Sequence, residues 1–189
     1  MRRILREVVE TVALVVLVMV AVNSVVDRTH VEGPSMQPTL KSGQFLLTNK
    51  LAYSGLVSRV FASDDADGYH RPGVPHRFDI VIVRYPQDEK VNFVKRVIGL
   101  PGETIELRDG TVYIDGQALD EPYVTFRDMS RMEPRLIGPD AVFVMGDNRP
   151  RSNDSRAFGA VKLDQIVGQA WFRYWPMAEL GLLPATSGR

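Results

Sequence analysis

The chain contains no cysteine among its 189 residues, and its 23 basic and 23 acidic side chains cancel. Without cysteine there is no disulfide, no thiol nucleophile and no thiolate metal site. With a net charge of zero, the chain lacks the surplus of basic residues that is typical of nucleic-acid-binding proteins, so we expect no nucleic acid partner. The chemistry of this protein therefore depends on hydroxyl, amine, carboxylate or imidazole groups.

Histidine is scarce as well, and we interpret the three that occur, His30, His70 and His76, as surface residues. The acidic stretch SDDADG, residues 63–68, is similar to the start of a calcium-binding loop. Val74 stands where such a loop requires its closing glutamate. We interpret the stretch as a solvated loop, and we predict neither a metal nor a cofactor.

One long apolar run is present, at the N-terminus. Residues 12–22 are apolar without interruption, and residues 8–26 as a helix would measure about 28 Å, close to the thickness of the hydrocarbon core of a bilayer. The run is apolar on every face, which is not typical of a core helix. Glu7, Glu10 and the lack of an A-x-A site speak against a cleaved signal peptide, so a retained transmembrane anchor is favoured.

Three basic residues, Arg2, Arg3 and Arg6, precede the apolar run. The positive-inside rule then predicts a single-pass protein of the plasma membrane whose N-terminus is cytoplasmic. We expect residues 1–27 to form a cytoplasmic tip and anchor. Residues 28–189 would form one extracytoplasmic domain.

After the anchor, the pattern is that of short strands without the alternation of strands and helices that a parallel sheet needs. β-branched and apolar segments are found at residues 44–50, 79–85, 92–98, 103–107, 111–114, 141–145 and 167–175. Asp109-Gly110 is a strong hairpin signal. Residues 161–166 favour a short turn or helix, and residues 119–139 an irregular covering or edge segment. The pattern predicts a mainly antiparallel β fold with a small β insertion at about residues 103–140.

The segment VEGPSMQPTL, residues 31–40, holds Ser35 between Pro34 and Pro38, with Gly33 just upstream. Proline fixes its own φ and restricts the residue before it, so the backbone is rigid and presents the hydroxyl in a fixed direction. Serine in such a segment is usually only a turn residue. The segment alone does not decide between a turn and a nucleophile.

Lys95 lies in the predicted strand at residues 92–98, where alternate residues share a face. Phe93, Lys95 and Val97 share one face, and Arg96 lies between apolar neighbours on the other. The periodicity therefore does not choose between the two cations, and a strand lysine that reaches to water is one interpretation. Chemistry favours the lysine as a base, because burial can remove its proton whereas arginine stays charged.

A third polar stretch, GDNRPRSNDSR at residues 146–156, follows the predicted strand at residues 141–145. It is compatible with a polar loop in which Asp154 pairs with Arg156. It is equally compatible with a shell of side chains that orients a catalytic lysine.

Together, the anchor and the motifs GPSMQPTL, RFDIVIVRYP, FVKRVIGLPGE and GDNRPRSNDSR resemble type I signal peptidase, the membrane-bound leader peptidase of bacteria. Each motif alone is weak, but their common order over nearly the whole chain is specific. The resemblance implies a serine endopeptidase with a Ser–Lys dyad that removes signal peptides from exported preproteins after small residues of the Ala-x-Ala type. It also implies that the protein acts at the lipid bilayer, beside the secretion translocon. The implied fold is like that of the repressor autoproteases.

By position in the motifs, the resemblance makes Ser35 the nucleophile and Lys95 the general base. Ser152 corresponds to a hydroxyl that hydrogen-bonds the lysine. Asp154 and Arg156 correspond to an ion pair that supports it, and we expect that loss of Asp154 would leave Arg156 without its partner.

The resemblance also implies that substrate lies extended between residues 28–35 and residues 92–95, in contact with Gly33, Pro34 and Phe93. Such strand addition takes affinity from the main chain and selectivity from side-chain pockets. Some members carry a Ser or Thr donor for the oxyanion at the position of Gly33. Here the oxyanion would bind the Ser35 backbone N–H and a second donor that the sequence does not identify.

Two other interpretations stay open from the sequence. One is a self-cleaving Ser–Lys protease of the repressor type, which would be cytoplasmic and so conflicts with the apolar run. The other is an inactive membrane-anchored β-domain that only binds exported chains. Intact residues at all three key positions, Ser35, Lys95 and Ser152, speak against it.

Overall fold

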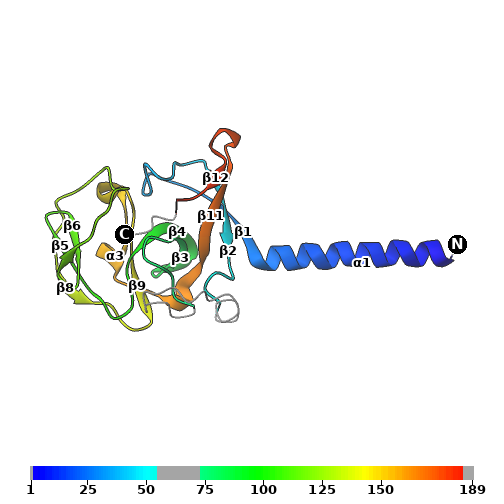
Figure 1. Cartoon of the computed structure of the whole chain (residues 1–189), viewed down its shortest axis with the longest axis horizontal. Coiled ribbons are helices and arrows are strands. Elements are labelled where there is room, and N and C mark those ends of the chain that lie inside the picture. The colour runs from blue at the N-terminus through cyan, green and yellow to red at the C-terminus, as the bar shows by residue number, and fades with distance from the viewer. Residues whose placement is uncertain (1, 55–72, 185–189) are drawn as a thin grey trace.

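The computed structural model describes residues 2–54 and 73–184, and the predicted acidic loop at residues 63–68 and His70 lie outside these described residues. One long helix, α1 (Arg2–Val25), projects from a body made of strands (Figure 1). Its apolar side chains are exposed along its length. Within the described residues it is the one helix long and apolar enough to cross a membrane.

Helix α1 begins earlier than the apolar run. The helix continues through the charged residues because Arg6 Nε donates to Glu10 Oε1 at 2.7 Å, one turn away, and Arg3 lies 3.7 Å from Glu7. Such i,i+4 pairs stabilise an exposed helix by a few tenths of a kcal/mol each.

The main sheet confirms the predicted antiparallel β fold. Its strand order is β1-β2-β11-β3-β4-β9-β10, with β12 paired to β11 and every pairing antiparallel. The strands are β1 (Val26–His30), β2 (Phe45–Asn49), β3 (Ile80–Tyr85), β4 (Asp88–Gly99), β9 (Ala141–Met145), β10 (Val161–Lys162), β11 (Ile166–Trp175) and β12 (Gly181–Leu182). Strand β1 has a mostly polar sequence, so no apolar pattern predicted it. Strand β1 pairs with β2, and the hydroxyls of Thr29 and Thr48 form a hydrogen bond of 2.8 Å between the two strands.

A second sheet, with strand order β7-β6-β5-β8, spans the region of the predicted insertion (Figure 1). Its strands are β5 (Thr104–Arg108), β6 (Thr111–Ile114), β7 (Gln117–Ala118) and β8 (Met132–Leu136). The predicted hairpin at Asp109-Gly110 is confirmed, and both residues have positive φ, as a type I′ turn requires. The expectation that residues 119–139 are irregular was wrong for β8. This strand is mostly exposed at an edge of the sheet, where its proline is tolerated.

Short helical turns complete the fold: η1 (Arg149–Arg151), α3 (Ser155–Phe158), η2 (Leu163–Gln165) and η3 (Met177–Glu179). Turn η2 confirms a helical turn within residues 161–166.

Strand β3 lies at the centre of the core and is buried on both faces. Ile80 and Ile82 pack into one apolar cluster with Met36, while Val81 and Val83 pack into another with Val97. Burial of each such side chain contributes about 1.5–3 kcal/mol. Because β3 is packed on both faces, it fixes the position of its neighbour β4. Val81 of β3 is paired with Lys95 of β4.

Candidate active site

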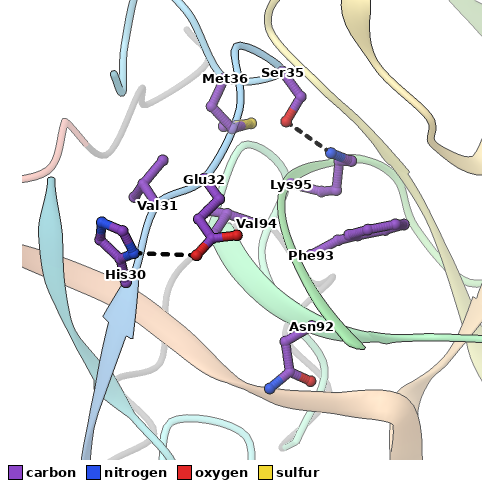
Figure 2. Close-up of a pocket in the computed structure, with 9 residues that line it drawn as sticks. All are labelled: His30, Val31, Glu32, Ser35, Met36, Asn92, Phe93, Val94 and Lys95. Atoms are coloured by element: carbon purple, nitrogen blue, oxygen red, sulfur yellow. Dashed lines mark hydrogen bonds and ion pairs between the residues drawn. The ribbon is translucent and has the colours of Figure 1, made fainter. Parts of the chain in front are cut away.

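Ser35 and Lys95 meet in the folded chain. Lys95 Nζ lies 2.9 Å from Ser35 Oγ and donates a hydrogen bond to it (Figure 2). Ser35 comes from the turn that follows β1, whereas Lys95 comes from β4. The lysine is only 3% exposed, so this amine is withdrawn from water.

The backbone around Ser35 is held against the polar loop at residues 146–156. The Asn148 N–H donates to the Ser35 carbonyl oxygen at 3.0 Å. Any side chain at Gly146 would collide with that same oxygen and with Ser152 Oγ, so only glycine allows the two segments to approach this closely. In the described part of the chain, no acceptor is bonded to the Ser35 backbone N–H.

Burial is the largest influence on the amine of Lys95, and it lowers the pKa of Lys95 from 10.5 to about 8. The carboxylates of Asp154 and Asp147 act in the opposite direction, whereas the charge of Arg156 lowers this pKa further. The Phe93 ring centroid lies 5.1 Å from Nζ and covers one side of the amine. The folded protein therefore favours a neutral lysine far more than water does.

Arg96 points away from the dyad, which resolves the choice that periodicity left open. Its guanidinium is fully buried and binds both oxygens of Asp147, at 2.8 and 2.7 Å. It also donates to the Phe78 carbonyl oxygen at 3.0 Å and lies 4.1 Å from the centre of the Tyr123 ring. Arg96 thus ties β4 to the polar loop, and its role is structural.

Asp154 and Arg156 form the predicted ion pair, with 2.8 Å between Asp154 Oδ1 and Arg156 Nε. The expectation that Arg156 would have no partner without Asp154 was wrong. Arg156 also binds Asp128 at 2.6 Å and the Arg149 carbonyl oxygen at 2.7 Å. Asp154 accepts the Gly146 N–H at 3.0 Å and caps α3 through the Arg156 N–H. Asp154 and Arg156 therefore each form further polar contacts outside the pair.

Ser152 lies beside the dyad without reaching it. Its hydroxyl oxygen is buried next to Gly146 and has no hydrogen-bond partner within the described residues. The hydrogen bond to Lys95 that the resemblance implied is therefore not formed in this structure.

Sequence reasoning missed a second layer of charges under the polar loop. Arg149 is 2% exposed and binds both oxygens of Glu121, one of them at 3.0 Å. Like Asp128, Glu121 comes from residues 119–131, the segment between β7 and β8, which we call the strap. The Phe126 carbonyl oxygen of the strap also accepts the Arg149 N–H at 3.2 Å. Nothing in the local sequence distinguishes these charges from surface charges.

A pocket of about 120 Å³ opens beside the dyad, between the segment after β1 and the middle of β4, residues 92–95 (Figure 2). Its lining consists of His30, Val31, Glu32, Ser35, Met36, Asn92, Phe93, Val94 and Lys95. Of the predicted substrate contacts, Phe93 lines the pocket, whereas Gly33 and Pro34 do not. His30 is exposed, as predicted, and it also lines the pocket, where its Nδ1 lies 3.3 Å from Glu32 Oε1.

Among the described residues, no group of three or more His, Asp or Glu side chains could hold a metal ion. The charged groups that act on the Lys95 amine beside the Ser35 hydroxyl are the carboxylates of Asp154 and Asp147 and the guanidinium of Arg156, and His30 and Glu32 also line the pocket. Such a set can transfer a proton from serine to lysine and stabilise the charges that result.

The chain is similar to known signal peptidases over most of its length. A family model described as signal peptidase, peptidase S26, matches residues 4–175. Signal peptidase I of Bacillus caldolyticus is 39% identical over 163 residues, which cover 79% of this chain and 79% of that protein. Signal peptidase IB of Staphylococcus aureus is 32% identical over 186 residues, which cover 89% of this chain and 87% of that protein.

A solved structure of a signal peptidase I from Enterococcus faecalis is 39% identical, with a TM-score of 0.45, and the match covers 50% of this chain and 95% of that chain. Neither a self-cleaving repressor-type protease nor an inactive binding domain is supported by these relatives. The match of the family model over most of the chain, together with these identities, shows that the chain belongs to the signal peptidase family, peptidase S26.

Proposed function

We propose that this chain cleaves signal peptides by attack of Ser35 on the scissile carbonyl carbon, with Lys95 as the general base. Membership in the family makes the chain a serine endopeptidase that acts on signal peptides of exported preproteins. The proposal assigns that reaction to residues. The observation that carries it is the 2.9 Å contact between Ser35 Oγ and a buried lysine amine at the end of a pocket.

The reaction begins with the neutral form of Lys95. With a pKa of about 8, about one molecule in ten carries it at pH 7, against about one in 2,500 for an unperturbed lysine. Lys95 Nζ takes the Ser35 proton as Oγ bonds to the carbonyl carbon. The resulting ammonium then gives that proton to the leaving amine as the peptide bond breaks. Water, activated by the same amine, hydrolyses the acyl-enzyme and restores Ser35.

The negative oxygen of the tetrahedral intermediate needs donors. The Ser35 backbone N–H suits this role, since within the described residues it donates to no other group. Gly33 supplies no side-chain donor. Its φ of 80° is one that only glycine adopts freely, and it turns the chain just before the nucleophile.

Substrate binding by strand addition agrees with the edges that the fold leaves open. Among the described strands, β1 pairs only with β2, and β9 pairs with β4 only from Arg96 onward. The part of β4 that lines the pocket, residues 92–95, therefore has one edge without a partner among the described strands. An extended substrate fits between these two edges. The apolar floor of Val31, Met36 and Val94 favours small side chains, in line with Ala-x-Ala sites.

Helix α1 is the proposed membrane anchor, with Arg2, Arg3 and Arg6 on the cytoplasmic side. Ser35 follows the end of α1 by ten residues, so Ser35 lies at most about 33 Å from the end of α1. We propose that the reaction takes place at the outer surface of the bilayer, beside the translocon that delivers the substrate.

Two substitutions in the full chain, assayed in detergent micelles on a preprotein, test the assignment. Ser35→Ala should abolish cleavage because no nucleophile remains. Lys95→Arg should abolish it as well, because arginine keeps a charge but cannot accept the proton. Lys162→Arg, on an exposed short strand, is the control and should keep full activity. Cleavage above a few per cent in either dyad variant would contradict the proposed roles.

A further inference from the structure

Three aromatic rings from separate parts of the chain meet behind the dyad lysine. Tyr85 ends β3, Phe93 lies in β4 two residues before Lys95, and Phe158 ends α3 after the polar loop. The ring centroids are 4.8 Å apart for Tyr85 and Phe93, 5.6 Å for Tyr85 and Phe158, and 6.3 Å for Phe93 and Phe158. We call these three residues the aromatic wall.

Only the Phe93 ring of the wall touches the site, since it lines the pocket and covers Lys95 Nζ at 5.1 Å. Tyr85 and Phe158 lie behind it. Phe158 also packs on the valine cluster under β4, and the Tyr85 hydroxyl donates outward to Gln87 at 2.6 Å. Both rings are therefore held by contacts outside the wall, and they can keep the Phe93 ring in place.

We propose that Tyr85 and Phe158 are positioning residues for the cleavage reaction, which hold the Phe93 ring against Lys95 and keep water out of the dyad. This inference rests on the proposed role of Lys95 as the base. The wall joins β3 and β4 to α3, so it also links the lysine strand to the loop that carries Asp154 and Arg156.

The physical reason is the hydration of the lysine ammonium. If Phe158 is truncated, the Phe93 ring loses its support on one side and water can reach Nζ. Water favours the charged form, so the pKa of Lys95 should rise back toward its ordinary value. The ring itself attracts the ammonium weakly, which acts in the opposite direction. Burial is the first of the influences that set the pKa of this amine, and we expect the rise to prevail.

The charged groups that face the amine stay the same in this experiment. They are Asp154, Asp147 and Arg156 from the polar loop. Glu32 lines the same pocket. Arg96, the residue after Lys95, points to the other face of β4 and binds Asp147.

The test is the dependence of kcat/KM on pH for the full chain in detergent micelles, with a signal-peptide substrate. Wild type should lose activity as the pH falls below about 8. In Phe158→Ala, this acidic limb should move up by about one pH unit, so that kcat/KM falls about tenfold at pH 7 and recovers near pH 10. Phe158→Tyr keeps the ring and should keep the wild-type limb. Tyr85→Ala should act in the same direction as Phe158→Ala.

Tyr113→Ala is the matched control, because it removes a half-buried aromatic ring from β6 in the second sheet. It should leave the acidic limb in place even if it lowers thermal stability. An equal loss of kcat/KM at every pH in Phe158→Ala, or a limb that does not move, would overturn the inference. Activity of Lys95→Arg would instead overturn the proposed base, so the two failures can be told apart.

Discussion

At the scale of single residues, Lys95 shows a conflict between stability and chemistry. A lysine that is 3% exposed has lost most of its hydration, and this lowers its pKa from 10.5 to about 8. In the unfolded chain the same amine keeps its ordinary pKa and binds its proton more tightly. Below pH 8 both states carry the ammonium, and the folded state bears its full desolvation cost. Above pH 10.5 both are neutral and this cost disappears.

Lys95→Met should therefore stabilise the fold at pH 7 while it abolishes cleavage. The difference between 10.5 and about 8 corresponds to about 3 kcal/mol, which is the upper bound for the gain. The gain should shrink as the pH rises above 8 and vanish above 10.5. Denaturant unfolding of the full chain in detergent at pH 7 and pH 10.5 would measure it. Lys162→Met, at an exposed position, should show no such dependence, and a Lys95→Met variant less stable than wild type at pH 7 would contradict the argument.

At the scale of elements, the strap at residues 119–131 is joined to the polar loop by two ion pairs. It supplies Glu121 to the buried Arg149 and Asp128 to Arg156, which is partly exposed. The two pairs differ in burial, because both side chains of the first are 1% exposed whereas those of the second are 14% and 23% exposed. A buried charge that loses its partner costs far more than one that water can reach.

Glu121→Gln should accordingly lower the free energy of unfolding by about 3–5 kcal/mol, because it leaves the Arg149 guanidinium buried without a counter-charge. Asp128→Asn should cost at most about 1 kcal/mol, because Arg156 keeps its bonds to Asp154 and is closer to water. Thermal and denaturant unfolding of the two variants side by side would compare them. Equal losses of stability would show that the strap does not act through the buried pair.

At the scale of the whole molecule, the anchor and the β body are separate in space, with α1 projecting from the side of the body where β1 begins (Figure 1). The chain enters β1 directly after α1, and β1 leads to Ser35 after five residues. The proposed anchor and the nucleophile are thus joined by a short segment that is paired to β2.

If the three N-terminal arginines stay in the cytoplasm, the body should be accessible to added protease in spheroplasts of a bacterial host. A reporter fused after Arg189 should then give an extracytoplasmic signal. A cytoplasmic protein in the same cells should stay protected and serves as the control. A cytoplasmic signal from the fusion would contradict the proposed orientation.

The sequence by itself determined the features that arise within a few neighbouring residues. The apolar character of α1, the turn at Asp109-Gly110 and most strand positions follow from local rules of solvation and backbone geometry. The order of the motifs was enough to indicate the family, which the comparisons confirm. Strand β1 lacked an apolar pattern, because at the sheet edge it needs no buried face.

Only the tertiary structure decided which distant residues meet. Ser35 and Lys95 are 60 positions apart, and the sheet register brings them within 2.9 Å. The same register turns Lys95 toward the pocket and Arg96 toward Asp147, although both lie between apolar neighbours in the sequence. The strap pairs and the aromatic wall have the same origin. Charges and rings carry no local mark of their partners, because contacts across a fold depend on how whole strands are aligned.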